Sequence, residues 1–166
     1  MMKIEQIAVD MDMVLCNFKS RFKELYLSEP EVDYISNNKR NQAYRENFHN
    51  FIQNKQFSTL DPMPDLQEGL NYLKTLNVHI WILSSTAKEE YLNEVSAQKK
   101  IWLKNHNIPY HPVFVPGKRM KCYYAKPGRI LIDDTVSNIE SWIEGGGVGI
   151  LHTNWTDTIN ILKQHF

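Results

Sequence analysis

Short runs of apolar and β-branched residues recur along the chain and predict five β-strands. The runs cover residues 3–9, 78–83, 112–115, 129–132 and 148–151. Runs this short are typical of buried strands rather than of helices. Three of them end directly at polar side chains: the first at Asp10, the second at Ser84 and the fourth at Asp133.

Apolar residues at helical spacing occupy the segments between these runs. In the segment 66–76, four leucines fall on one face of a helix, and the segments 88–105, 136–143 and 156–166 show the same 3.6-residue period. Strands that alternate with helices indicate an α/β fold with a parallel sheet. Right-handed crossovers then favour a doubly wound, Rossmann-like sheet.

One long polar segment interrupts this alternation. It contains no convincing strand, and helices are expected at residues 18–27 and 41–54. The segment is too long for a simple crossover, so we interpret it as a helical cap inserted after the first strand. Pro62 and Pro64 return the chain to the core, since proline interrupts helices. The predicted domains are a catalytic core of residues 1–18 and 66–166 and a cap of residues 19–65.

Acidic groups gather at the predicted strand ends. Asp10 and Asp12 follow the first strand, and Asp133 and Asp134 follow the fourth. Ligands of parallel sheets bind beyond the carboxyl ends of the strands, so these carboxylates should converge. Their mutual repulsion would be relieved by a divalent cation, and oxygen ligands without His or Cys favour Mg²⁺.

This set of groups is suited to phosphoryl transfer. With the metal ion in place, an aspartate can attack phosphorus and form an aspartyl-phosphate. Ser84 can hydrogen-bond a phosphate oxygen, and a lysine can neutralise another. The candidates for that lysine are Lys118, Lys121 and Lys126.

The order of these motifs resembles that of the haloacid dehalogenase (HAD) superfamily. That pattern is D-x-D after the first strand, Ser or Thr after the second, a lysine, and an acidic pair after the fourth. The matching residues here are Asp10 and Asp12, Ser84, a lysine within 118–126, and Asp133 and Asp134. Met13 departs from the pattern, which usually has glycine there.

The resemblance implies a role for each of these residues. Asp10 would be the nucleophile and a metal ligand. Asp12 would be the general acid and base, with its backbone carbonyl also on the metal. Asp134 would bind Mg²⁺ directly, and Asp133 directly or through water. Among the lysines, Lys121 is favoured because related sequences place this residue a short loop before the fourth strand.

A narrower resemblance is to the 5'(3')-deoxyribonucleotidases. It is carried by the sequences DMDMVLCNF at 10–18 and FSTLDPMP at 57–64, by Trp102, by Ser84 with Ser85, and by the LIDD run. It implies that Phe18 and Phe57 flank a nucleobase and that Ser85 contributes to substrate binding. Thr86 departs from the proline usual at that position.

Charge and composition limit the kinds of binding partner that are expected. The 19 basic and 19 acidic side chains give a formal net charge of zero, which disfavours nucleic acid as a partner. No apolar run could span a bilayer, and residues 1–12 do not resemble a signal peptide. The two cysteines are expected as reduced thiols. Together these features predict a cytoplasmic protein without a membrane partner, and they do not decide whether it forms a homo-oligomer.

The sequence therefore predicts an enzyme: a Mg²⁺-dependent phosphomonoester hydrolase acting on a small phosphorylated substrate, most simply a deoxynucleoside monophosphate. One alternative is a polynucleotide 3'-phosphatase, with residues 118–121 as a local basic rim. The other is a non-catalytic module with the HAD fold. The presence of both Asp10 and Asp12 argues against that second alternative.

Overall fold

The computed structural model of the chain describes residues 2–27 and 39–166. Its centre is a five-stranded parallel sheet with the order β3-β2-β1-β4-β5. The strands are β1 (Gln6–Val9), β2 (His79–Ser85), β3 (His111–Val115), β4 (Arg129–Asp133) and β5 (Val148–Leu151). The order reverses at β1, which pairs with β2 on one side and β4 on the other. The doubly wound parallel sheet that the sequence predicts is thereby confirmed, and each predicted run is a strand.

Alternate residues of the central strands enter two different apolar clusters. Ile7, Val9 and Ile132 belong to the larger cluster, whereas Ala8 and Leu131 belong to the smaller one. All five are completely buried. Helices that cover both faces of a parallel sheet require apolar side chains on both, which is why these strands are nearly continuous hydrophobic runs.

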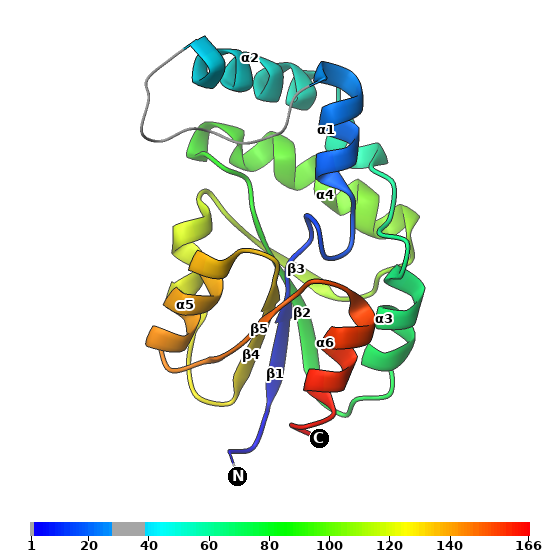
Figure 1. Cartoon of the computed structure of the whole chain (residues 1–166), viewed down its shortest axis with the longest axis vertical. Helices are drawn as coiled ribbons and strands as arrows, with labels where there is room; N and C mark the ends of the chain where they lie inside the picture. The colour runs from blue at the N-terminus through cyan, green and yellow to red at the C-terminus, as the bar shows by residue number, and fades with distance from the viewer. Residues whose placement is uncertain (1, 28–38) are drawn as a thin grey trace.

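Helices α3 (Leu66–Leu73) and α6 (Trp155–Leu162) pack against each other beside the sheet, and α5 (Val136–Glu144) lies near β4 and β5 (Figure 1). The α3–α6 contact depends on Gly69. A Cβ atom at that position would lie 2.1 Å from the indole ring of Trp155. Any larger residue at position 69 would therefore push the two helices apart.

The inserted segment forms a helical layer beyond the carboxyl ends of the strands (Figure 1). It contains α1 (Phe18–Tyr26), α2 (Lys39–Gln53) and the 3₁₀ helix η1 (Gln56–Thr59). Phe22, Phe51 and Phe57 form its buried aromatic centre. The cap predicted after the first strand is therefore present, while its limits at residues 19 and 65 stay a prediction.

Helix α4 (Leu92–Asn105) follows the short 3₁₀ helix η2 (Glu89–Tyr91) and joins this cap to the sheet. The side-chain amide of Gln98 donates to the carbonyl of Ile52, at 2.8 Å, and its oxygen accepts from Phe57 N, at 3.1 Å. The indole nitrogen of Trp102 donates to the carbonyl of Leu60, at 2.7 Å. The cap is thus attached to the core through buried side chains of α4.

None of the helices within residues 2–27 and 39–166 combines the length and apolar character needed to cross a bilayer. Both cysteines, Cys16 and Cys122, are free thiols, as the sequence predicts.

Candidate active site

Three neighbouring strands deliver the predicted polar groups to one edge of the sheet. Asp10 directly follows β1, Ser84 lies near the end of β2, and Asp133 is the last residue of β4. The backbone amide of Asp10 donates to the carbonyl of Ile132, at 3.0 Å, so strand pairing continues up to the site. The structure therefore brings together residues that are more than one hundred positions apart in the sequence, at the topological switch point.

Asp10 and Lys121 form a buried ion pair. Lys121 comes from the 3₁₀ helix η3 (Lys118–Tyr124), and its Nζ lies 2.9 Å from Asp10 Oδ1 and 2.7 Å from Asp133 Oδ2. Burial lowers the pKa of Lys121, but Asp10 and Asp133 outweigh this effect and raise it overall, so the side chain stays charged. Lys118 and Lys126 are exposed, which leaves Lys121 as the lysine of the three at the site.

Asp133 is held by groups that the sequence reasoning did not include. Its Oδ1 accepts a hydrogen bond from Thr135 N, at 2.8 Å, and its Oδ2 accepts from Asn138 Nδ2, at 3.1 Å, in addition to Lys121. The carboxylate is completely buried. Asn138 was recognisable only as the third residue of a helix that begins after an acidic pair. Asp133 therefore orients Lys121 as well as adding negative charge.

Carboxylates crowd this edge of the sheet. One carboxylate oxygen from each of Asp10, Asp133 and Asp134 lies within 4.8 Å of the others. Burial raises the pKa of Asp10 well above its usual value, and Asp133 raises it further, despite the neighbouring Lys121. Burial, together with Asp133 and Asp12, raises the pKa of Asp134 to about 6. Crowded oxygen ligands whose ionisation is this costly fit a hard divalent cation such as Mg²⁺.

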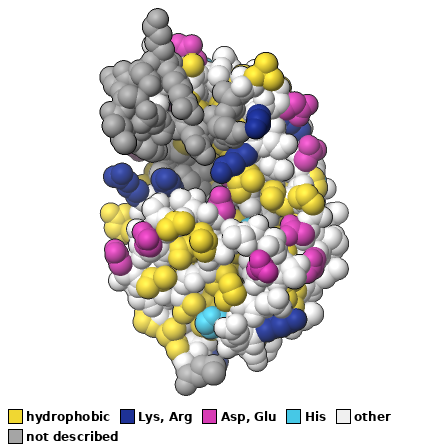
Figure 2. All heavy atoms as spheres, viewed as in Figure 1, with side chains coloured by type: hydrophobic (Ala, Val, Ile, Leu, Met, Phe, Trp, Pro, Cys, Tyr) yellow, Lys and Arg dark blue, Asp and Glu magenta, His cyan; other side chains and the backbone are white. Residues whose placement is uncertain are grey.

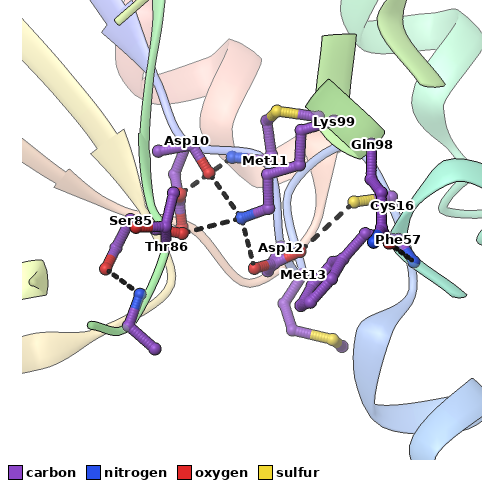
Figure 3. A network of polar contacts seen from close by, with 12 residues as sticks. Asp10, Met11, Asp12, Met13, Cys16, Phe57, Ser85, Thr86, Gln98 and Lys99 are labelled. Carbon is purple, nitrogen blue, oxygen red and sulfur yellow. Dashed lines mark hydrogen bonds and ion pairs between the residues drawn. The ribbon is translucent and has the colours of Figure 1, made fainter. Parts of the chain in front are cut away.

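Asp12 has a different environment from Asp10. Its side chain is 29% exposed and is not among the three clustered carboxylates. Its Oδ2 accepts from Lys99 Nζ, at 2.9 Å, and its Oδ1 accepts from Cys16 Sγ, at 3.5 Å (Figure 3). Burial raises the pKa of the Cys16 thiol, and Asp12 raises it further, so the thiol is present as a donor.

Lys99 is a site residue that the sequence reasoning missed. It extends from α4 to the site, and its Nζ also donates to Ser84 Oγ, at 2.8 Å, and to the Ser85 carbonyl, at 2.9 Å (Figure 3). Its position in the sequence gives a signal, because Lys99 lies four residues after Val95 and three before Trp102, both of which are completely buried. A lysine on the apolar face of a helix requires a partner in the core.

The turn after β1 has the backbone shape that usually calls for glycine. Met13 has φ of 65°, in the left-handed region. Its amide donates to the carbonyl of Cys16, at 2.8 Å, which closes the turn. The departure from the glycine of the HAD pattern therefore leaves the turn intact, at a conformational cost of about 1 kcal/mol.

Phe18 and Phe57 both lie in the aromatic centre of the cap, where they stack on one another. Their ring centroids are 5.5 Å apart with an interplanar angle of 13°. Phe57 is only 3% exposed, so its faces are occupied by protein, whereas Phe18 is partly exposed. Ser85 Oγ accepts from the backbone amide of Ala87, at 3.1 Å, and so stabilises the turn after β2. The roles of these three residues in substrate binding stay predictions.

The face of the molecule drawn in Figure 2 carries charged side chains of both signs. On the face drawn in Figure 2, lysine and arginine side chains are interspersed with acidic and neutral ones. This agrees with the formal net charge of zero.

Comparisons with known proteins agree with this geometry. The sequence matches the family described as 5' nucleotidase, deoxy (pyrimidine), cytosolic type C protein over residues 3–162. No curated protein sequence matches the chain.

Among solved structures, a hydrolase from Streptococcus pneumoniae TIGR4 is similar, with a TM-score of 0.55 and 15% identity over 98% of this chain and 100% of that one. A HAD family hydrolase from Deinococcus radiodurans R1, with bound phosphate and sodium, has a TM-score of 0.51 and 13% identity over 98% and 89% of the two chains. A putative β-phosphoglucomutase from Thermotoga maritima has a TM-score of 0.52 and 12% identity over 98% and 100%. At these identities the likeness supports the fold, which is that of the HAD hydrolases.

Proposed function

We propose a reaction for this chain, which belongs to the 5' nucleotidase, deoxy (pyrimidine), cytosolic type C family. The enzyme removes the phosphate of deoxynucleoside monophosphates in the presence of Mg²⁺, and Asp10 is phosphorylated in the course of the reaction. Membership of this family makes the chain a phosphatase of the 5'-nucleotidase kind and disfavours a non-catalytic module. The observation that carries the proposal is the buried Asp10–Lys121 pair beside the clustered carboxylates. We also propose that the enzyme acts in the cytoplasm.

Asp10 is suited to act as the nucleophile because its two oxygens differ. Oδ1 accepts hydrogen bonds from Met11 N, at 2.8 Å, and from Lys121 Nζ. Within the described residues Oδ2 has no donor, so its lone pairs are available for attack. In the proposed first step Oδ2 forms a bond to phosphorus, and the bond from phosphorus to the ester oxygen breaks with its electron pair on that oxygen.

Asp12 is placed to move the protons. It is more exposed than Asp10 and follows it by two residues, so it can face the leaving oxygen of a bound substrate. In the first step it donates a proton to that oxygen. In the second step it accepts a proton from the water that attacks phosphorus, and the bond from phosphorus to Asp10 breaks. Inorganic phosphate and free Asp10 result.

The residues that would hold the metal ion are Asp10, Asp134 and the backbone carbonyl of Asp12, with Asp133 binding directly or through water. When bound, Mg²⁺ would neutralise the repulsion between the phosphate and Asp10 and orient the transferring group. The clustered carboxylate oxygens and their raised pKa values support this assignment.

The phosphate oxygens would be bound by Ser84 and Lys121. Ser84 Oγ already accepts a hydrogen bond from Lys99, so its own hydroxyl hydrogen is available for a phosphate oxygen. Lys121 has acceptors for two of its three hydrogens in Asp10 and Asp133, which leaves the third for the substrate. The cap would exclude bulk water and favour a mononucleotide over a strand end.

The test is phosphate release with Mg²⁺ from deoxynucleoside monophosphates, 3'-phosphorylated oligonucleotides and sugar phosphates. Wild type is compared with Asp10→Asn and with Asp61→Asn, which makes the same change at an exposed position. We expect turnover of deoxymononucleotides that is lost only in Asp10→Asn. A preference for oligonucleotide ends would instead favour the 3'-phosphatase, and activity retained in Asp10→Asn would refute the nucleophile assignment.

A further inference from the structure

Lys99 is a completely satisfied ammonium in the interior of the protein. Its side chain is 1% exposed. The three acceptors around Nζ are Asp12 Oδ2, Ser84 Oγ and the Ser85 carbonyl, all between 2.8 and 2.9 Å away. A lysine ammonium has three hydrogens, so each of them is already used.

This saturation distinguishes Lys99 from Lys121. Lys121 retains one hydrogen that can bind a phosphate oxygen, whereas Lys99 could do so only by releasing Asp12, Ser84 or the Ser85 carbonyl. Lys99 therefore acts on the substrate through the groups it holds. We propose that Lys99 is a positioning residue of the reaction, which fixes the carboxylate of Asp12 for proton transfer and turns the hydroxyl of Ser84 toward the phosphate. This inference rests on the proposed function, because the roles of Asp12 and Ser84 come from it.

The hydrogen-bond directions support the second part of this role. Lysine can only donate, so Ser84 Oγ must be the acceptor in their contact. The hydroxyl hydrogen then points away from Lys99, and Ser84 is completely buried, so bulk water does not compete for it. Without Lys99 the hydroxyl loses this contact and is free to rotate away from the phosphate.

The exposure of Asp12 indicates that the protein can fold without Lys99. Burying an ammonium is costly, and an apolar side chain of similar length would pack at this position between Val95 and Trp102. Asp12 is 29% exposed, so water can solvate its carboxylate when Lys99 is replaced. The protein should therefore fold without Lys99 and lose function.

Helix α4 also links this contact to the cap. Lys99 Nζ lies 5.0 Å from the centroid of the Phe57 ring, and the preceding residue, Gln98, accepts from the backbone amide of Phe57. Two successive residues of α4 therefore have different contacts: Gln98 binds the cap at Phe57, and Lys99 binds the carboxylate of Asp12. This pair supplies a matched control on the same helix.

The experiment compares Lys99→Met with Lys100→Met, which removes the same charge from the exposed neighbour, and with Gln98→Leu. Two substrates are used: a deoxynucleoside monophosphate, whose alkoxide leaving group needs a proton, and p-nitrophenyl phosphate, whose leaving group does not. We expect Lys99→Met to lose on the order of 10²-fold in kcat/KM for the nucleotide. The loss for p-nitrophenyl phosphate should be roughly tenfold smaller, and KM should change little. The kcat/KM values of Lys100→Met should match those of wild type. Gln98→Leu should lower kcat/KM by the same factor for both substrates.

Two outcomes would overturn the inference: full activity in Lys99→Met, or equal losses on both substrates. A measurement without turnover separates this inference from the proposed function. The melting temperatures of Lys99→Met, Asp12→Asn and the double variant should be non-additive, because the two side chains contact each other directly. Additive shifts in melting temperature would refute the coupling of Lys99 to Asp12, whether or not the enzyme is active. If the wild type hydrolysed no substrate of the panel, the proposed function would be refuted, and the melting temperatures would still test the coupling.

Discussion

Lys121 and Asp10 form an ion pair with Nζ 2.9 Å from Oδ1, and neither side chain is more than 9% exposed. The second aspartate of the same tripeptide, Asp12, has its own lysine, Lys99, at the same distance. The two lysines come from different elements, η3 and α4. Two carboxylates that are two residues apart thus have separate cations and different exposure, which allows one to act as nucleophile and the other to transfer protons.

Replacing Lys121 by methionine should both destabilise and inactivate the enzyme. The change leaves Asp10 and Asp133 buried without a cation, which typically costs about 3–5 kcal/mol of unfolding free energy. Loss of a group that stabilises the transferring phosphoryl should lower kcat by about 10²- to 10³-fold. Urea unfolding and steady-state kinetics measure the two effects.

Lys118→Met is the control for this change, because Lys118 lies on the same segment and is exposed. Its unfolding free energy should stay within about 0.5 kcal/mol of wild type. If Lys118→Met lost as much activity as Lys121→Met, the assignment of the catalytic lysine would be wrong.

The sequence was sufficient for the sheet because the three central strands, β2, β1 and β4, are buried on both faces. The stretches 7–9, 80–83 and 130–132 are therefore apolar at every position, and the helices between the strands keep a clear period. Strand ends then place Asp10, Ser84 and Asp133 together, since strand order alone brings them to one edge.

The contacts of the cap and of α4 could not be predicted in the same way. In the segment 88–105 the apolar residue Ile101 is 49% exposed, whereas the charged residue Lys99 is buried. From the sequence alone, Lys99 is expected on the solvated face of the helix, as most lysines are. Its three acceptors come from other elements, so no local pattern predicts them. The stacking of Phe18 on Phe57 is likewise a long-range contact that no local pattern encodes.

Magnesium should stabilise the protein more at pH 7.5 than at pH 5. The pKa of Asp134 is raised to about 6, above the value near 3.9 of an unfolded chain, so between these values the folded protein binds more protons. The stability that this group contributes is complete below about pH 4 and is lost as pH rises through 6. Mg²⁺ needs the ionised carboxylate, so the rise in melting temperature on adding MgCl₂ should increase across the same range.

Asp134→Asn provides the control for this pH dependence. The amide cannot ionise, so between pH 5 and 7.5 the metal-free variant should lose less stability than wild type, by about 1.4 kcal/mol, the equivalent of one pKa unit. Its melting temperature should hardly respond to MgCl₂. An equal response of wild type at both pH values would contradict the assignment of Asp134 as a ligand.

The turn at Met13 should distinguish between substitutions by shape. With φ of 65°, a β-branched residue is strained, so Met13→Val should lose about 1–3 kcal/mol of unfolding free energy. Met13→Gly should lose far less, because glycine adopts this conformation without strain. Urea unfolding of the two variants tests this directly, and equal losses would show that the Met13 side chain matters through its packing.

Phe18 and Phe57 should differ in what their replacement changes. Phe57 is buried against Phe18 and Phe51, so Phe57→Ala should lose about 3–5 kcal/mol of unfolding free energy, measured by urea unfolding.

Phe18 is partly exposed and can offer one face to a base. Phe18→Leu keeps the apolar volume but removes that face, so KM for a deoxynucleoside monophosphate should rise about tenfold. KM for glycerol phosphate, which has no base, should not change. Equal rises in KM for the two substrates would mean that Phe18 serves only to pack the cap.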